Sequence, residues 1–501
     1  MKNKSPGVIW LLFALALVFL MPSNQSLWID EGFTLPYAQD SSFANFVSRL
    51  QSEEGSESLM PLGMLSSWAG AKIFGQSELG LRAVSALWAV VAVLLLWRTG
   101  VLIGFAWLPA LLACHPFLWY YASEVRPYAM VIAMGSGLLY AFVAILSPDG
   151  KANWGFYALL LFGPLLCATY VLGVVPFAVV VGVAALALFQ RRWKPRAREI
   201  LAFVLSGGAL IALGLYDASA VSRGADINWE GPWKTGLGSL LFSGYELLGF
   251  MGFGPGRIEL RQSAIEHGIV GSLRSLAHPA AVGLVVLALL YIVILLRFWK
   301  RFRSDQSTAD RLVPVTGFVI AVTMGIVFVV CLTVGSVFWG RRLASVLPFV
   351  VLAAGIAASA PRRIGQRPLN VLPLFLGATL LTSSLLVRFN PHHSRDDYRG
   401  AARIARTAVQ EGKTVWWAGD QVVAEYYNVV FCGADPADQR ACVVRTNNRD
   451  KRGLEHLPEP DVILISKPEL FDTSGAVRSY IDEHRFQLKS HLMAFQVFEA
   501  P

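Results

Sequence analysis

Charged residues are scarce in this chain. Asp, Glu, Lys and Arg make up 15% of its 501 residues, whereas a soluble globular chain carries about 25%. Hydrophobic residues make up 55%, and the mean hydropathy is +0.51. This composition argues against an ordinary soluble enzyme, and we expect most of the chain to lie in lipid.

Cysteine is also scarce, with five residues in the whole chain. Three of them, Cys114, Cys167 and Cys331, fall in apolar runs and are interpreted as plain core residues. No His/Cys cluster has the spacing of a structural zinc site. Residues 390–501 also lack a glycine-rich phosphate loop, which argues against a nucleotide site there.

The net charge of +9 invites a nucleic-acid interpretation, but the basic residues follow the membrane topology instead. They gather in short loops that alternate with loops of lower basic density, the positive-inside pattern of a cytoplasmic face. The pattern therefore excludes nucleic acid as a partner. These basic positions are Arg98, Lys151, Arg191–Arg196, Arg297 with Lys300–Arg303, and Arg362–Arg363.

Apolar windows of about 17–25 residues predict membrane-spanning helices. We count about eleven, with a cytoplasmic N-terminus and an extracytoplasmic C-terminus in a multi-pass protein of the plasma (inner) membrane. Lys2 and Lys4 before the first window leave a cleaved signal peptide open. No small-x-small cleavage site stands out, which favours an uncleaved anchor. The windows are 7–22, 82–99, 101–119, 128–147, 153–169, 171–189, 199–216, 279–298, 312–337, 343–360 and 369–388.

The predicted fold is therefore a polytopic α-helical membrane protein with a small C-terminal α/β domain. Residues 1–389 form the transmembrane domain, with long outer loops at 23–81 and 216–278, and residues 390–501 form the extracytoplasmic domain. In that domain, helical periodicity alternates with short β-like runs. Helices are expected at 396–411 and 476–483, and strands at 414–417, 442–445, 462–466 and 494–498.

Three polar groups stand out at the expected outer face. Asp30-Glu31 follows the first apolar window, Glu124 and Arg126 lie in an aromatic run, and Arg341-Arg342 run against the positive-inside trend. The arginine pair suggests an anionic partner such as phosphate. The plain alternatives are two solvated acids, a local Glu124–Arg126 ion pair, and arginines that snorkel from helix ends.

Four short motifs resemble one family, the polyprenyl-phosphate-sugar glycosyltransferases of the GT-C class, which include protein O-mannosyltransferases and lipid A aminoarabinose transferases. Leu59-Met60-Pro61 departs from the pattern, because many relatives carry His-Pro-Pro or Lys-Pro-Pro there. The motifs are Trp28-Ile29-Asp30-Glu31, Phe74–Glu78 with Leu81-Arg82, Tyr120-Tyr121-Ala122-Ser123-Glu124-Val125-Arg126-Pro127-Tyr128, and Arg341-Arg342-Leu343 with Leu347-Pro348.

The resemblance implies a GT-C type catalytic domain that transfers a sugar from a polyprenyl-phosphate donor to an extracytoplasmic acceptor hydroxyl, with inversion. It implies Asp30 as general base. Glu31 orients the acceptor or sugar, or binds a divalent metal if one is used. Arginines bind the donor phosphate, and membrane lipid is a further partner. The phosphate candidates are Arg82, Arg126, Arg341 and Arg342, with Glu124, Tyr121 and Tyr128 in support.

Two other functions stay open at this point. A transporter or flippase for lipid-linked sugars would carry ionisable residues in mid-membrane and internal repeats, and the predicted spans have almost no charge and no visible repeat. A lipid-linked oligosaccharide polymerase or ligase shares the topology but uses other acid–base groups.

The extracytoplasmic placement of residues 390–501 also predicts a disulfide. Cys432 and Cys442 would lie in an oxidising compartment, where cysteines pair. Asp435-Pro436 between them favours a turn that brings the two sulfurs together. Two free thiols are the alternative if the compartment is cytoplasmic.

Overall fold

The computed structural model describes residues 5–52, 55–147, 152–190, 196–222, 235–256, 259–260, 281–303, 308–359, 371–432 and 441–501. Most of the expected loop 216–278, including Asp226, Trp229, Glu230 and Trp233, lies outside these ranges. The expected turn at Asp435-Pro436 lies outside them as well.

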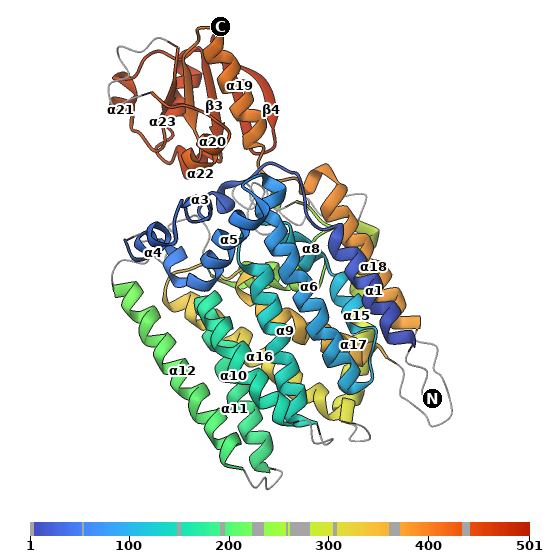
Figure 1. Cartoon of the computed structure of the whole chain (residues 1–501). Coiled ribbons are helices and arrows are strands. Elements are labelled where there is room, and N and C mark those ends of the chain that lie inside the picture. Colours follow the sequence, from blue (N-terminus) through green and yellow to red (C-terminus); the bar gives the residue numbers. More distant parts are fainter. Residues whose placement is uncertain are drawn as a thin grey trace. The chain divides into compact units, whose positions relative to one another are not determined.

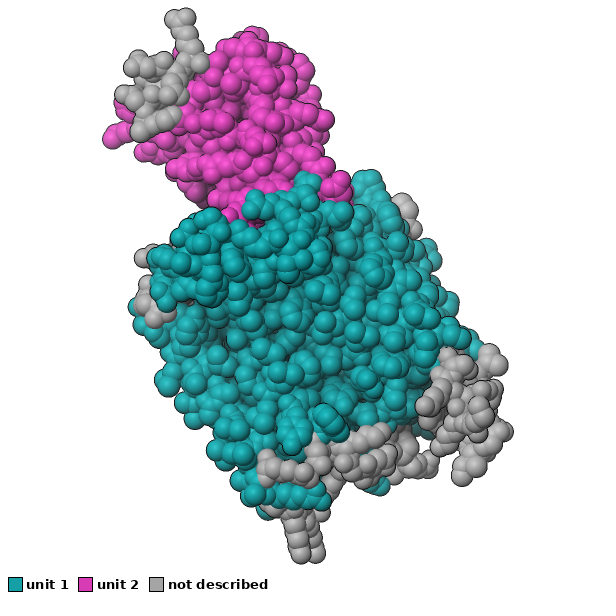
Figure 2. Space-filling view, in the orientation of Figure 1, with its two compact units in different colours: residues 1–23, 40–229, 233–393 teal, residues 24–39, 230–232, 394–501 magenta. Residues whose placement is uncertain are grey.

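The chain divides into two compact units, coloured separately in Figure 2. Unit 1 holds the described residues of 1–23, 40–229 and 233–393, and unit 2 holds 24–39 and 394–501. The domain boundary expected near residue 390 stays a prediction. Residues 24–39, which the sequence assigned to the first outer loop, fall in the same compact unit as residues 394–501.

Unit 1 is helical throughout its described part (Figure 1). Eight of its helical segments are long and apolar enough to cross a membrane, and two shorter apolar helices, Gly7–Val18 and Trp154–Thr169, match further predicted windows. The helices are α1 (Ser5–Phe19), α4 (Phe43–Ser52), η1 (Ser56–Leu59), α5 (Pro61–Phe74), α6 (Glu78–Ile103), α7 (Leu108–Ala113), α8 (Pro116–Ala122), α9 (Tyr128–Leu146), α10 (Ala152–Thr169), η2 (Val171–Gly173), α11 (Val174–Gln190), α12 (Ala197–Ser222), α13 (Leu237–Leu247), α15 (Ala281–Phe302), α16 (Thr308–Thr333), η4 (Gly340–Val346), α17 (Leu347–Ala358), α18 (Val371–Phe389) and η5 (Pro391–His393).

The predicted span at 101–119 is not a continuous helix. Gly104, in the left-handed conformation (φ 78°), ends α6, and two short helices, α7 and α8, follow. His115 separates them because a residue before proline is disfavoured in the α region, and it is extended here (φ −84°, ψ 124°). At 1.5 Å per residue, each short helix spans only about 9–11 Å.

Burial explains why this broken stretch is tolerated. Every residue of α7, α8 and the links from Leu108 to Tyr128 is buried among other helices. Irregular backbone at membrane depth is stable only when protein, not lipid, surrounds it. The neighbouring α9 is equally central, with 94% of its apolar window buried, whereas α12 and α15 bury 17% and leave most of their apolar surface facing outward.

Unit 2 contains α2 (Ile29–Gly32), α3 (Leu35–Gln39) and a five-stranded sheet with flanking helices (Figure 1). The strand order is β2-β1-β3-β5-β4, where β2, β1 and β3 are parallel and β5 runs antiparallel to both β3 and β4. The elements are α19 (Tyr398–Gln410), β1 (Val415–Ala418), α20 (Gln421–Tyr426), β2 (Val443–Arg445), α21 (Lys451–Glu455), β3 (Val462–Ser466), α22 (Pro468–Phe471), α23 (Ala476–Glu483), β4 (Gln487–Leu492) and β5 (Phe495–Glu499).

The expected α/β character of this domain is confirmed, with one strand missed. The two predicted helices and four predicted strands correspond to α19, α23, β1, β2, β3 and β5. Strand β4 escaped prediction because it is an edge strand, mostly exposed and polar, so it has no buried apolar run to reveal it. Cys432 and Cys442 are joined by a disulfide, with their Cα atoms 5.7 Å apart.

Candidate functional site

The Asp30-Glu31 pair lies in the single turn of helix α2, in unit 2. Glu31 is fully buried, and its carboxylate accepts a hydrogen bond from the backbone N–H of Trp28 at 3.2 Å. A carboxylate that accepts an N–H at the start of a helix also interacts favourably with the helix dipole. Asp30, in contrast, is only half-buried. The two adjacent acids therefore occupy different environments.

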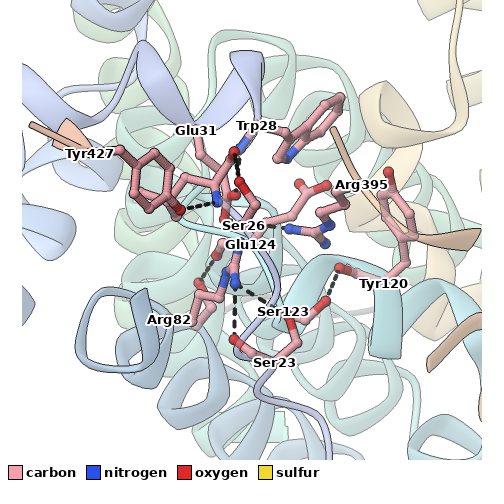
Figure 3. A network of polar contacts seen from close by, with 12 residues as sticks. Ser23, Ser26, Trp28, Glu31, Arg82, Tyr120, Ser123, Glu124, Arg395 and Tyr427 are labelled. Atoms are coloured by element: carbon pink, nitrogen blue, oxygen red, sulfur yellow. Dashed lines mark hydrogen bonds and ion pairs between the residues drawn. The ribbon is translucent and has the colours of Figure 1, made fainter. Parts of the chain in front are cut away.

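Glu31 forms an ion pair with Arg395, with 3.4 Å between a carboxylate oxygen and a guanidinium nitrogen (Figure 3). Arg395 also lies 5.8 Å from the centre of the Trp28 ring, and Lys467 lies 5.6 Å from the same ring. Lys467 in turn pairs with the buried Asp396. Paired charges around one aromatic ring thus surround the Asp-Glu turn.

This arrangement changes the interpretation of Glu31. Its carboxylate is engaged by the Trp28 N–H and by Arg395, and no part of the residue is exposed. Among the described residues, no three His, Cys, Asp or Glu side chains lie close enough together to hold a metal ion. The environment of Glu31 does not fit a metal ligand, and we assign no step to a metal.

Arg82 is fully buried near the start of α6 in unit 1. Its guanidinium donates to the backbone carbonyl of Ser23 at 2.9 Å and to the Ser23 hydroxyl at 3.3 Å (Figure 3). These contacts tie α6 to the end of the segment that follows α1. The structure thus shows a structural role for Arg82, and its expected phosphate contact stays a prediction.

Arg126 forms a buried ion pair with Glu57, at 2.8 Å, and the two side chains are 7% and 6% exposed. Glu57 lies in η1, so the pair joins the first long loop to the segment between α8 and α9. A local ion pair with Glu124 was the plain alternative that the sequence left open for Arg126. That side chain is itself buried, and its backbone carbonyl accepts a hydrogen bond from the Ser85 hydroxyl at 2.5 Å.

Tyrosines and arginines from distant parts of unit 1 form one cluster, which we call the arginine–tyrosine cluster. It consists of Tyr121, Tyr128, Tyr170, Arg126, Arg341 and Arg342. The ring of Tyr128 is 5.0 Å from Tyr121 and 6.2 Å from Tyr170, centre to centre. The guanidinium carbons of Arg126 and Arg341 lie 6.0 and 5.9 Å from the Tyr128 ring.

The two late arginines differ in their contacts. Arg341 lies 4.4 Å from the Trp339 ring, which suits a planar guanidinium. Arg342 donates to the backbone carbonyl of Val337 at 2.6 Å and to the Ser336 hydroxyl. Burial raises the pKa of Tyr170 to about 12, while the nearby positive charges of Arg342 and Arg341 oppose this shift. Arg126 and Arg341 thus lie against one ring, that of Tyr128, and the phosphate contacts expected of all these arginines stay predictions.

Several charged residues with important contacts were not identified from the sequence. They include Glu57, Arg395, Asp396 and Lys467, together with Glu246 of α13, which is fully buried and accepts the Gly340 N–H at 3.0 Å. Their partners lie far away in the chain, so no local pattern identifies them. The sequence offered one weak signal, at Glu57, which is an acidic residue shortly before the apolar helix α5.

No protein-family model matches the chain, and no curated protein sequence matches it. Solved structures with similar backbones are those of ArnT from Cupriavidus metallidurans in the apo state (TM-score 0.45, 14% identity) and bound to undecaprenyl phosphate (0.43, 13%). Each match covers 98% of this chain and 97% of that chain. The mycobacterial arabinofuranosyltransferase AftD (TM-score 0.41, 12% identity) is matched over all of this chain and 40% of its own.

The chemical capacities of the site follow from this chain's own residues. Unit 1 offers clustered guanidinium groups and aromatic rings, which suit an anion attached to an apolar or sugar group. Unit 2 offers a half-buried carboxylate at Asp30, in a turn held by the buried Glu31–Arg395 ion pair. Anion binding and proton acceptance are the two chemical capacities of these residues.

Proposed function

We propose that this integral membrane protein is a glycosyltransferase that moves a sugar from a polyprenyl-phosphate donor to an acceptor hydroxyl. The observation that supports this most directly is the contrast within the Asp-Glu turn. Glu31 is fully buried and ion-paired, whereas Asp30 is half-buried and keeps solvent exposure. A carboxylate that water can reach, fixed in a rigid turn, suits a general base.

In the proposed reaction, the acceptor oxygen attacks the anomeric carbon of the donor sugar, and the hydroxyl proton passes to the Asp30 carboxylate. The bond between the anomeric carbon and the phosphate oxygen breaks, and polyprenyl monophosphate leaves with the electron pair. Attack opposite the leaving group inverts the anomeric centre. The leaving phosphate needs little protonation, so one base suffices.

The arginine–tyrosine cluster has the second task in this proposal. Arg126, Arg341 and Arg342 stabilise the charge that grows on the departing phosphate, as fixed positive charges do in low-dielectric sites. Tyr128 provides the aromatic ring against which Arg126 and Arg341 lie, and Tyr121 packs against Tyr128. The Ser85 hydroxyl, which donates to the Glu124 carbonyl, supports the backbone two residues before Arg126.

The proposal is tested by turnover of the purified protein with a polyprenyl-phosphate sugar and a panel of hydroxyl acceptors. We expect release of polyprenyl monophosphate by the native protein and a loss of roughly 100-fold or more in Asp30→Asn, as is typical for a removed general base. The matched control is Asp482→Asn, which changes an exposed acid in α23 of the same unit.

Turnover of Asp30→Asn within about threefold of the native rate, under ~1 kcal/mol of barrier, would refute the base assignment. Movement of an intact donor across the membrane without release of polyprenyl monophosphate would instead identify a flippase. Transfer only from a polyprenyl diphosphate oligosaccharide would identify a polymerase or ligase.

A further inference from the structure

The segment from Asn24 to Gly32 is fastened to the C-terminal domain by its backbone. The Leu27 N–H donates to the Tyr427 hydroxyl at 2.8 Å. The Arg399 backbone N–H donates to the Ser26 hydroxyl at 3.0 Å, and the Arg399 guanidinium donates to the Asn24 carbonyl at 2.8 Å. Asn24, Ser26 and Leu27, which precede the Asp-Glu turn, are therefore held by residues that lie 373–400 positions later in the chain.

Packing supports the same attachment. A Cβ atom at Gly32 would lie 2.7 Å from Cγ2 of Val423 and 3.1 Å from Oδ1 of Asp420, so α2 approaches α20 more closely than a side chain would allow. Ile29 packs against the apolar core of the domain, which includes Trp416, Ile463 and Ile465. The turn is thus part of the folded domain and not a loop on its surface.

Charge pairing makes this arrangement specific. Glu31 and Arg395 are 0% and 4% exposed, and Lys467 and Asp396 are 8% and 2% exposed. Buried charges are costly unless each keeps its partner. Both cations also contact the Trp28 ring, two residues before Asp30. A shift of the turn would separate Glu31 from Arg395 and move the Trp28 ring away from both cations, so these contacts favour one orientation of the turn.

We propose that the C-terminal domain is part of the catalytic machinery because it positions Asp30, and that Arg395 is the main positioning residue. Arg395 holds Glu31 and Trp28, and these two residues bracket the peptide that carries Asp30. This inference rests on the proposed function, since it supplies the orientation that a general base needs. It also assigns the domain a role other than acceptor binding.

The first test compares Arg395→Ala, Arg395→Lys and the control Arg406→Ala in the full-length protein. Arg406 is exposed on α19, the helix that begins three residues after Arg395. We expect kcat of Arg395→Ala to fall roughly 30- to 100-fold with the donor KM within about threefold, because misplacement of a catalytic group by about 1 Å has this effect. Arg395→Lys should recover part of the rate, and Arg406→Ala should behave as the native protein.

Hydrogen exchange on the same preparations gives a readout that does not depend on activity. In Arg395→Ala, the amides of Leu27–Gly32 should exchange at least roughly tenfold faster, while those of β1 and β3 stay protected, which reports local opening. If Arg395→Ala fails to fold, Tyr427→Phe serves instead, because it removes only the hydroxyl that accepts the Leu27 N–H. It should show the same pattern with a smaller, roughly threefold to tenfold, loss of kcat.

Unchanged exchange at Leu27–Gly32 in both variants would overturn the anchoring. Faster exchange with native kcat would overturn the positioning role. A higher acceptor KM at native kcat would assign the domain to acceptor binding and overturn it too. A native protein without turnover would refute the proposed function, and the exchange result alone would then decide the anchoring.

Discussion

Arg126 belongs to a buried ion pair with Glu57 and is also one of the proposed phosphate-binding residues. Their ion pair is almost completely buried inside a helical unit, and Arg126 also contacts the Tyr128 ring. Removal of one member of a buried pair leaves an uncompensated charge, which typically destabilises a protein by about 3–5 kcal/mol. Loss of stability and loss of phosphate binding must therefore be separated for this arginine.

Arg126→Ala should lower both thermal stability and donor use, the latter by roughly 10- to 100-fold, or about 1.4–2.7 kcal/mol. The double variant Arg126→Met with Glu57→Gln removes both charges and should recover most of the stability, while donor use stays low. Melting temperature and donor kcat/KM are measured on the same preparations. Recovery of both quantities in the double variant would mean that Arg126 has only a structural role.

Arg341→Ala gives a second test of the phosphate assignment at a guanidinium that lies against the Trp339 and Tyr128 rings. We expect donor use to fall roughly 10- to 100-fold, with a smaller loss of stability than in Arg126→Ala. Donor kcat/KM compared at several ionic strengths provides the measurement. A native kcat/KM in Arg341→Ala would show that Arg341 does not bind the donor phosphate and only packs against aromatic rings.

Glu31→Gln should separate the two acids of the turn. The amide cannot form an ion pair with Arg395, so the free energy of unfolding of unit 2 should fall, whereas Asp30→Asn should leave it nearly unchanged. Turnover should fall less in Glu31→Gln than in Asp30→Asn. Thermal unfolding followed by tryptophan fluorescence and turnover together check this order. The reverse order of turnover would make Glu31 the base.

At the scale of elements, close helix packing determines where the late arginines lie. Helix α9 packs directly against η4, the short helix that carries Arg341 and Arg342. A Cβ atom at Gly135 of α9 would lie 2.4 Å from the backbone oxygen of Ser345, so the two elements meet through a glycine. Interiors at this density respond to a single added methyl group.

Gly135→Ala should therefore displace η4 and lower donor use by roughly tenfold, about 1.4 kcal/mol, together with thermal stability. Gly182→Ala is the matched control, because a Cβ atom there has no neighbour within 4 Å and the position is exposed on α11. Donor kinetics and melting temperature of both variants are compared with the native protein. Equal behaviour of the two variants would contradict the packing argument.

At the scale of the whole molecule, the extracytoplasmic placement of the C-terminal domain stays a prediction. Eight long apolar helices, two shorter ones and the broken stretch α7–α8 account for all eleven predicted windows. If each crosses once, the C-terminal domain lies on the opposite side from the N-terminus. Cys432 and Cys442 are paired in that domain, as expected in an oxidising compartment.

Labelling of intact cells with an impermeant lysine reagent tests this topology. Lys451, exposed in the C-terminal domain, should be labelled, and Lys300, in the last turn of α15, should be labelled only after permeabilisation. Lysine is compared with lysine, so reactivity does not confound the result. Labelling of Lys300 alone in intact cells would reverse the orientation.

Removal of the disulfide gives the last prediction. Replacement of both cysteines by serine should lower the stability of unit 2 by about 2–3 kcal/mol, as the chain-entropy model predicts for so short a loop. Melting temperatures of native, reduced and double-serine protein are compared. Mass spectrometry of alkylated, non-reduced protein checks the bond itself, and both thiols labelled without reduction would refute it.

Local patterns were enough to predict the long helices and most of the C-terminal domain. Apolar windows located α6, α9–α12 and α15–α18, and alternating helical and β-like runs located β1, β2, β3 and β5. These features depend on residues within a few turns of one another, so their periodicity is visible in the chain. The same local signals identified Asp30, Arg126 and Arg341 as candidates.

Contacts between residues that are distant in the sequence were decided only by the tertiary structure. The break at Gly104 and His115 was hidden inside an apolar run, because hydropathy does not distinguish a buried broken helix from a continuous one. The Leu27–Tyr427 hydrogen bond joins residues 400 positions apart, and Arg126 meets Glu57 across 69. A buried charge is stable only beside its partner, and packing alone decides which partner that is.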